Sequence, residues 1–400
     1  MKRASLGPAH SRRYAAAICV AVAAVAACSA RHDPSAIFGD AGPDGTVDGG
    51  TIDADFMQPG DASIFEAGCA KGTATARKDP IYLLIVLDGS GSMGQDAKWQ
   101  AVVPALDLFV EDLLMHKDPT FGVGLTIFSD TNDRTGGAGP YPNMDVPIAF
   151  VDATQAAKLH GRIDAARPKG DTPTLAVLQG QYAALASYAP SAPLVGGGKK
   201  ALVFMTDGVP YPDPGTQQAA SIRAVSGAYA MSAPSGPITT LAVGIGYFFP
   251  YDPLTYDQKF MGEVAVAGGA PNPMCDPNDT VNSSRFCHFQ VTPNGQNDAY
   301  ALEQEFLIAF DKIRARLASC ELSLEKPDGG APVEPDKVNV VFTDDHGYEN
   351  VVPEDPTDGW TYDDPNNPTK VILHGKSCSD LKANVRGKVD VVLGCKTVVR

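Results

Sequence analysis

Four mostly apolar runs dominate the hydrophobic pattern of the chain. They occupy residues 81–88, 121–128, 200–207 and 238–245. Apolar runs of this length with little polar alternation are typical of strands that are buried on both faces, as in a parallel sheet. We therefore predict four central strands at these positions.

Between these strands lie segments with helical periodicity. In residues 98–114 the apolar side chains recur on one helical face. The same type of pattern predicts helices at residues 153–166, 174–188, 216–230 and 298–318. Buried strands that alternate with helices indicate an α/β fold with a doubly wound, mostly parallel sheet. We assign this domain to residues 69–319.

The pattern changes after residue 319. Helical periodicity stops, and short strand-like segments at 337–343, 369–374 and 388–394 are separated by turns rich in Pro, Asp, Gly and Asn. We expect a small, disulfide-linked, all-β module over residues 320–400.

The first 68 residues do not show a folding pattern. Residues 1–27 combine a basic start with a short apolar stretch that cannot span a bilayer but suits a signal peptide. Residues 28–68 are rich in Asp and Gly and poor in apolar residues, which predicts a flexible, self-repelling tether.

The cysteines that follow Cys28 are even in number, which in an exported chain indicates disulfides. Six cysteines allow many pairings. We favour Cys275–Cys287 as a local loop, Cys378–Cys395 across a predicted hairpin, and Cys69–Cys320 between the two ends of the α/β domain.

The formal net charge of the chain is −15. An acidic surface repels nucleic acids and anionic lipid headgroups, so we expect neither as a partner. The same charge is compatible with binding cations.

Polar side chains capable of metal binding follow three of the predicted elements. The sequence Asp88-Gly89-Ser90-Gly91-Ser92 comes directly after the first strand and offers hard oxygen ligands on a tight turn. Thr172 lies in a loop before a helix, and Asp207 ends another buried strand. In a doubly wound sheet these positions meet at the carboxyl edge, where ligands bind.

This combination resembles the von Willebrand factor type A family, which includes the integrin I-domains, over about residues 80–318. The resemblance implies a Rossmann-like fold with a metal-ion-dependent adhesion site (MIDAS). Its metal ligands would be Asp88, Ser90, Ser92, Thr172 and Asp207. It also implies a divalent cation, Mg²⁺ first with Mn²⁺ or Ca²⁺ as alternatives, and an acidic group of a protein or glycan partner that completes the shell. Thr174 is an alternative to Thr172.

The segment Val25-Ala26-Ala27-Cys28 resembles the lipobox of bacterial lipoproteins. The resemblance implies cleavage before Cys28, acylation of Cys28, and attachment to the membrane by the lipid alone. Ser29 favours the outer membrane, with the periplasmic and cell-surface faces both open. An ordinary signal peptide followed by a chance cysteine is the alternative.

The glycine turn has two other interpretations. Residues 89–94 fit the G-x-G-x-x-G pattern of dinucleotide sites. However, Asp88 would oppose a pyrophosphate, and the second strand ends near Phe128, too late to supply the ribose-binding acid. We therefore expect no nucleotide. The second interpretation is a glycine–serine turn that binds nothing.

The sequence does not suggest an enzyme. It contains neither a G-x-S-x-G elbow nor an H-E-x-x-H pair. We expect a lipid-anchored binding or adhesion protein of the cell envelope. The alternative is a structural or assembly protein whose metal site only stabilises loops.

Overall fold

The computed structural model describes residues 72–74, 76–132, 140–211, 216–232, 236–247, 256–292, 299–324, 334–344, 346–384, 387–393 and 396–399. The chain divides into two units, residues 1–56 and 57–400, and everything described lies in the second. The predicted signal peptide and tether, with Cys28, lie outside the described residues, as do Cys69 and Cys395. No described helix has the length and apolarity needed to cross a membrane.

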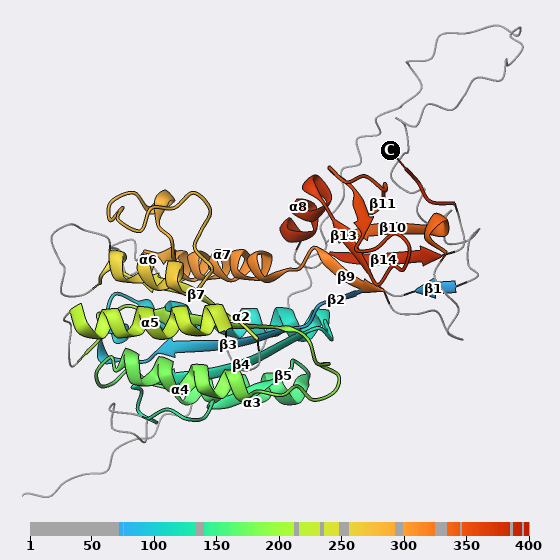
Figure 1. Cartoon of the computed structure of the whole chain (residues 1–400). Helices are drawn as coiled ribbons and strands as arrows, with labels where there is room; N and C mark the ends of the chain where they lie inside the picture. Colours follow the sequence, from blue (N-terminus) through green and yellow to red (C-terminus); the bar gives the residue numbers. More distant parts are fainter. Residues whose placement is uncertain are drawn as a thin grey trace, which may run out of the picture. The chain divides into compact units, whose positions relative to one another are not determined.

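A six-stranded sheet forms the centre of the α/β domain (Figure 1). Its order is β5-β4-β3-β6-β7-β8, and every pair is parallel except β4 with β5. The fold class predicted from the sequence is therefore confirmed. The strands are β3 (Ile81–Asp88), β4 (Phe121–Phe128), β5 (Val146–Phe150), β6 (Lys199–Thr206), β7 (Ile238–Ile245) and β8 (Phe289–Val291).

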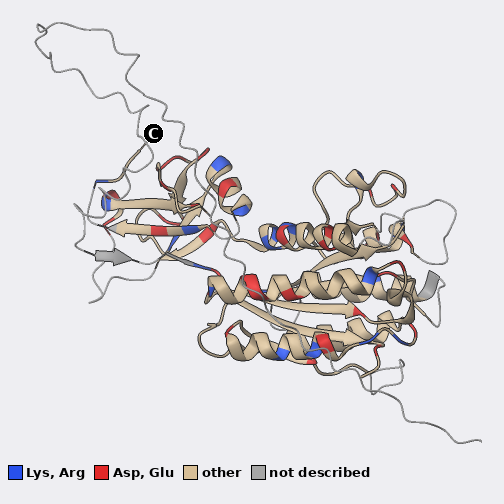
Figure 2. Cartoon of the chain, turned by 180° about the vertical axis from the view of Figure 1, so that it is seen from behind, with Lys and Arg blue, Asp and Glu red and all other residues tan. Residues whose placement is uncertain are grey.

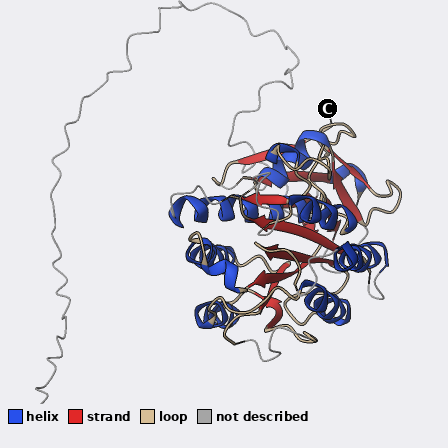
Figure 3. Ribbon diagram, turned by 90° about the vertical axis from the view of Figure 1, so that its left-hand side faces the viewer, coloured by secondary structure: helices blue, strands red, loops and turns tan. Residues whose placement is uncertain are grey.

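Helices cover both faces of this sheet, as the view in Figure 3 shows. One face packs against α2 (Lys98–His116), α3 (Ala153–Ala165) and α7 (Ala299–Leu317). The other packs against α4 (Thr174–Ser187), α5 (Thr216–Ser232) and α6 (Gln258–Ala267). Along β3, Leu83, Ile85 and Leu87 face the first layer, and Tyr82, Leu84 and Val86 face the second.

Two-sided burial explains the uninterrupted apolar runs. Each fully buried aliphatic side chain contributes about 1.5–3 kcal/mol, so polar residues are confined to the strand ends and the helices. Figure 2 accordingly shows the charged residues mainly on helices and loops, with few along the central strands.

The C-terminal module consists of two four-stranded antiparallel sheets, ordered β1-β14-β10-β11 and β12-β13-β9-β2. Side chains of both sheets share one apolar cluster that includes Leu322, Val340 and Trp360. The strands are β1 (Gly72–Ala74), β2 (Ala76–Lys78), β9 (Glu321–Leu324), β10 (Val338–Thr343), β11 (Glu349–Val352), β12 (Trp360–Tyr362), β13 (Lys370–Leu373) and β14 (Lys388–Leu393).

Two details of this module differ from the sequence prediction. Residues 72–78, which we assigned to the α/β domain, pair with β14 and β9, because these strands present backbone groups that need partners. The helices and strands of the α/β domain therefore lie between two paired strands, with Lys78 opposite Leu322. The module is also not all-β, because it contains the helix α8 (Gly375–Ala383), which buries Leu381.

The disulfides confirm one predicted pair and correct two. Cys275 is bonded to Cys287, as expected. Cys320 is bonded to Cys378, with a Cα–Cα distance of 5.4 Å, so the pairs Cys69–Cys320 and Cys378–Cys395 are wrong. The reason is that Cys378 lies in α8 rather than in a hairpin, and both Cys320 and Cys378 pack against the apolar cluster of the module.

The long-range disulfide is expected to contribute more stability than the local one. Replacing both Cys320 and Cys378 by Ser should lower the free energy of unfolding by about 4 kcal/mol, because the bridge spans a sequence separation of 58 residues. The matched control is the double replacement of Cys275 and Cys287, whose separation of 12 residues predicts about 3 kcal/mol. Denaturant unfolding measures both, and a larger loss for the control would contradict this prediction.

Candidate metal centre

The predicted metal ligands lie where the order of the strands reverses direction. From β3 the chain continues to β4 on one side, and β6 joins β3 on the other side. Such a switch point leaves a crevice at the carboxyl ends of the two strands. Asp88 is the last residue of β3, and Asp207 directly follows β6.

Direct hydrogen bonds connect four of the five predicted ligands. Asp88 Oδ1 accepts from the Ser90 N–H at 2.7 Å, and Asp88 Oδ2 accepts from Thr206 Oγ1 at 2.5 Å. The hydroxyls of Ser90 and Ser92 lie 3.1 Å apart. Ser92 Oγ donates to Asp207 Oδ1 at 2.8 Å. The turn after β3, which runs into the short 3₁₀ helix η1 (Gly91–Gly94), is thereby tied to the end of β6.

Thr172, the fifth predicted ligand, lies on a loop that is bonded to the same turns. The Gly91 N–H donates to Gly170 O at 3.1 Å, and the Tyr211 N–H donates to Thr172 O at 2.9 Å. A Cβ atom built on Gly208 would lie 3.2 Å from Thr172 Oγ1 and 3.9 Å from Ser92 Oγ. The Thr172 hydroxyl thus faces the turn that follows β6.

Thr174, the alternative to Thr172, has a different role. It is fully buried in the first turn of α4, and its hydroxyl lies 3.4 Å from Thr172 O. This geometry favours Thr172 over Thr174 as the threonine of the site.

Close packing explains why glycine follows Asp88. A Cβ atom on Gly89 would lie 2.9 Å from Phe128 O and 3.0 Å from Ile127 Cγ2, so the turn passes directly over the end of β4. Gly170, with φ of +85°, has a backbone conformation that L-residues rarely adopt. Both glycines allow the loops to approach one another closely.

Two carboxylates are buried together in this site. Asp88 is 0% exposed and Asp207 is 1% exposed. Burial, with a further contribution from the charge of Asp207, raises the pKa of Asp88 to about 7. Burial also raises the pKa of Asp207, against the opposing effect of the Lys98 ammonium. A cation held by these residues would favour the charged forms of both carboxylates.

Lys98 belongs to this site although the sequence pattern did not predict it. Its Nζ lies 2.5 Å from Asp207 Oδ2, and the residue is only 7% exposed. The signal available in the sequence was a lysine at the start of a predicted helix, next to the buried Trp99, where the positive end of the helix dipole disfavours a cation.

The residues fit a hard divalent cation. Two carboxylates and three hydroxyls offer only oxygen, which Mg²⁺ and Mn²⁺ prefer over softer ligands. In the part of the chain that the structure describes, no three His, Cys, Asp or Glu side chains are grouped so that they could hold a metal. Any metal bound at this edge of the sheet would therefore depend on the hydroxyls of Ser90, Ser92 and Thr172.

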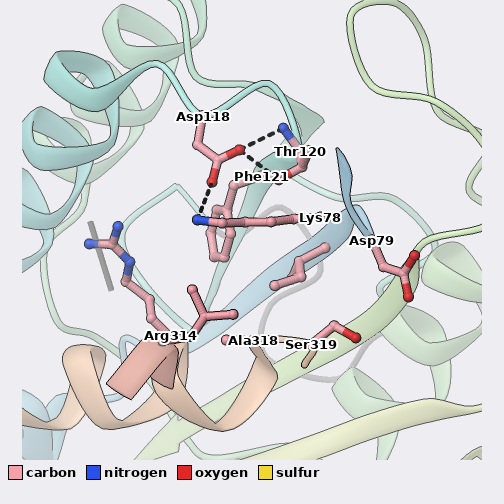
Figure 4. Close-up of a pocket in the computed structure, with 10 residues that line it drawn as sticks. Lys78, Asp79, Asp118, Thr120, Phe121, Arg314, Ala318 and Ser319 are labelled. Atoms are coloured by element: carbon pink, nitrogen blue, oxygen red, sulfur yellow. Dashed lines mark hydrogen bonds and ion pairs between the residues drawn. The ribbon is translucent and has the colours of Figure 1, made fainter. Parts of the chain in front are cut away.

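A small cavity of about 50 Å³ lies at the opposite edge of the sheet, near Phe121 at the start of β4 (Figure 4). In Figure 4, Lys78 and Asp118 point toward each other, with Lys78 Nζ 4.0 Å from Asp118 Oδ2. Asp118 Oδ1 also accepts from the N–H and hydroxyl of Thr120, and Lys78 donates to Gly387 O at 2.8 Å. The side chains of Lys78 and Asp118 are thus hydrogen-bonded or ion-paired within the protein. We interpret the cavity as part of the contact between β2 and the α/β domain.

A larger groove of about 790 Å³ lies beside β8 and α7, and His288 is among the residues that line it. His288 is 2% exposed, and its Nε2 lies 2.6 Å from the Tyr256 hydroxyl. Burial lowers the pKa of His288 to about 4, so the imidazole is neutral in the folded protein at neutral pH.

This neutral histidine predicts acid sensitivity. In the unfolded chain His288 titrates near 6.5 and takes up a proton that the folded chain takes up only near pH 4. The free energy of unfolding should therefore fall, by about 3 kcal/mol from this residue, as the pH decreases from about 6.5 to 4. Urea unfolding at pH 7 and pH 4.5 measures this loss as the difference between the wild type and His288→Gln, because the raised pKa of Asp88 changes the stability in the opposite direction over the same range. The exposed control His116→Gln should keep the pH dependence of the wild type; equal pH dependence in both variants would contradict the prediction.

Comparison with known proteins identifies the domain. The model of the von Willebrand factor type A domain family matches residues 83–251. Residues 83–251 therefore match a von Willebrand factor type A domain, and the resemblance noted in the sequence is confirmed at the level of domain and fold.

Several solved structures are similar to this chain. A von Willebrand factor type A protein from Catenulispora acidiphila is 12% identical with a TM-score of 0.39, over 82% of this chain and 67% of that one. The vWF domain of the type V pili tip protein Mfa5 from Porphyromonas gingivalis is 13% identical (TM-score 0.37, 58% and 96% covered). The manganese-loaded TRAP protein of Plasmodium vivax is 16% identical (TM-score 0.36, 72% and 83% covered). No curated protein sequence matches the chain.

Proposed function

We propose that this chain is a lipid-anchored binding protein of the bacterial cell envelope that uses a divalent cation to bind an acidic group of a protein or glycan partner. The observation that carries the proposal is the meeting of two buried carboxylates and three hydroxyls at one switch point of the sheet. These side chains are the proposed metal ligands Asp88, Ser90, Ser92, Thr172 and Asp207.

The composition of the ligand set supports binding of an anion. A cation held here supplies an electrophilic centre for a carboxylate. The chain contributes at most two negative charges, from Asp88 and Asp207, and otherwise neutral hydroxyls. Mg²⁺ suits this set of hard oxygens, with Mn²⁺ and Ca²⁺ as alternatives.

The contacts of the serines support binding rather than hydrolysis. Hydrolases with a serine nucleophile most often activate it with a histidine within hydrogen-bond distance. In the described residues, the side-chain hydrogen-bond partners of Ser90 and Ser92 are each other, Asp88 and Asp207, and none of these partners is a histidine. Attachment to the outer membrane through Cys28 and the location on its periplasmic or outer face are part of the proposal and are supported by the sequence alone.

The second candidate function is a structural or assembly role in the envelope, in which the metal only stabilises loops. The direct bonds between three loops favour it, because Gly91 is already bonded to Gly170, Tyr211 to Thr172, and Ser92 to Asp207. The two functions differ in whether loss of the metal abolishes partner binding or only lowers stability.

Metal binding is tested first by thermal unfolding of the chain from residue 29 onward, with EDTA, Mg²⁺, Mn²⁺ or Ca²⁺. Metal at about 100 times its Kd should add about 2.7 kcal/mol, or several degrees in Tm. Asp88→Ala should remove this shift, and the matched control Asp171→Ala, at an exposed carboxylate beside Thr172, should keep it. The proposal fails if no ion shifts the wild type, or if Asp88→Ala responds like the wild type.

Partner binding is then tested by capture from envelope extracts. The wild type in Mg²⁺ should retain a partner that is lost in EDTA and in Asp88→Ala, because the carboxylate contact requires the cation. Retention by Asp88→Ala at wild-type level, with the domain folded, would favour the structural role.

A further inference from the structure

The two carboxylate oxygens of Asp207 have different partners, Lys98 and Ser92. Its ammonium donates to Asp207 Oδ2 at 2.5 Å, whereas Asp207 Oδ1 accepts from Ser92 Oγ at 2.8 Å. The Lys98 side chain is 9% exposed and that of Asp207 is 0% exposed. A positive charge that belongs to the chain therefore lies inside the set of proposed metal ligands.

Local structure does not explain this position of Lys98. It is the first residue of α2, where the helix dipole disfavours a cation. The N-cap residue, Ala97, has φ of +57° and offers no side-chain hydrogen bond to the helix. Burying an ammonium is also costly unless it is paired. Asp207 is the carboxylate that compensates both costs.

We propose that Lys98 is a positioning residue of the metal centre, which holds Asp207 by one oxygen and weakens the affinity of the site for divalent cations. This inference rests on the proposed function, because it concerns the same site. The buried carboxylates of Asp88 and Asp207 have a formal charge of −2 together, and the buried ammonium of Lys98 changes the sum to −1. A cation held there is less neutralised by the chain, and it retains more charge for the acidic group of a partner.

Removing the charge of Lys98 should have two effects of opposite sign. With EDTA present, Lys98→Met leaves two buried carboxylates without their compensating cation, so the Tm should decrease by several degrees. With a metal present, the same variant should bind the ion more tightly, because the repulsion between the ammonium and the ion is gone. A residue that only supported the fold would not increase metal affinity when removed.

Isothermal titration of the folded chain from residue 29 onward with Mg²⁺ and Mn²⁺ tests the inference. Lys98→Met should lower the Kd about tenfold or more, and Lys98→Arg, which keeps the charge, should remain near the wild type. The control Lys158→Met removes an exposed charge from α3 and should leave the Kd unchanged. An unchanged or higher Kd in Lys98→Met, with the fold intact by circular dichroism, would overturn the inference.

The measurement of Tm in EDTA tests the inference separately from the proposed function. In EDTA, replacing Asp207 by Asn as well should recover part of the Tm lost in Lys98→Met, because one of the uncompensated charges is removed. A wild type that binds metal with the same Kd as Lys98→Met refutes only the role of Lys98. If the wild type, Lys98→Met and Lys98→Arg all bind no metal, both the proposed function and the inference fail.

Discussion

The burial of two carboxylates at the ends of adjacent strands is the constraint on which the site depends. Asp88 and Asp207 are almost completely removed from water at the carboxyl ends of β3 and β6, and the charge of Asp207 opposes ionisation of Asp88. The protein meets the cost with backbone donors, hydroxyls and one ammonium. The glycine turn, the Thr172 loop and the start of α2 converge on these carboxylates because each contributes hydrogen-bonding groups at this edge.

The central strands were predictable because burial on both faces leaves a direct trace in the sequence. Observed β3, β4 and β7 have the predicted bounds, and β6 differs by one residue at each end. The elements that were not predicted lack such a pattern. Strand β5 contains Pro147 and lies at the edge of the sheet, β8 has only three residues, and the helix α6 has only 10 residues.

The site was predictable to the extent that it follows strand ends, and not where it depends on contacts between distant residues. A motif after β3 and an aspartate after β6 must meet when the two strands are neighbours. The Lys98–Asp207 pair joins residues that are 109 positions apart in the sequence. Helical periodicity does not reveal that a lysine at the start of a helix is buried. The Cys320–Cys378 bond was missed for a related reason, because α8 places Cys378 against the module's apolar cluster where the pattern suggested a hairpin.

The pairing of β2 with β9 determines how the chain transmits mechanical force. The α/β domain is an insertion whose two ends are held side by side by the backbone bonds between Ala76–Lys78 and Leu322–Leu324. A pull on the chain ahead of Gly72 reaches the strands β1 and β2 first, where it acts against their pairing with β14 and β9. These hydrogen bonds must break before β2 can be pulled away from β9 and the two ends of the α/β domain can separate. A domain inserted in this way keeps its two ends together while the chain ahead of it is under tension.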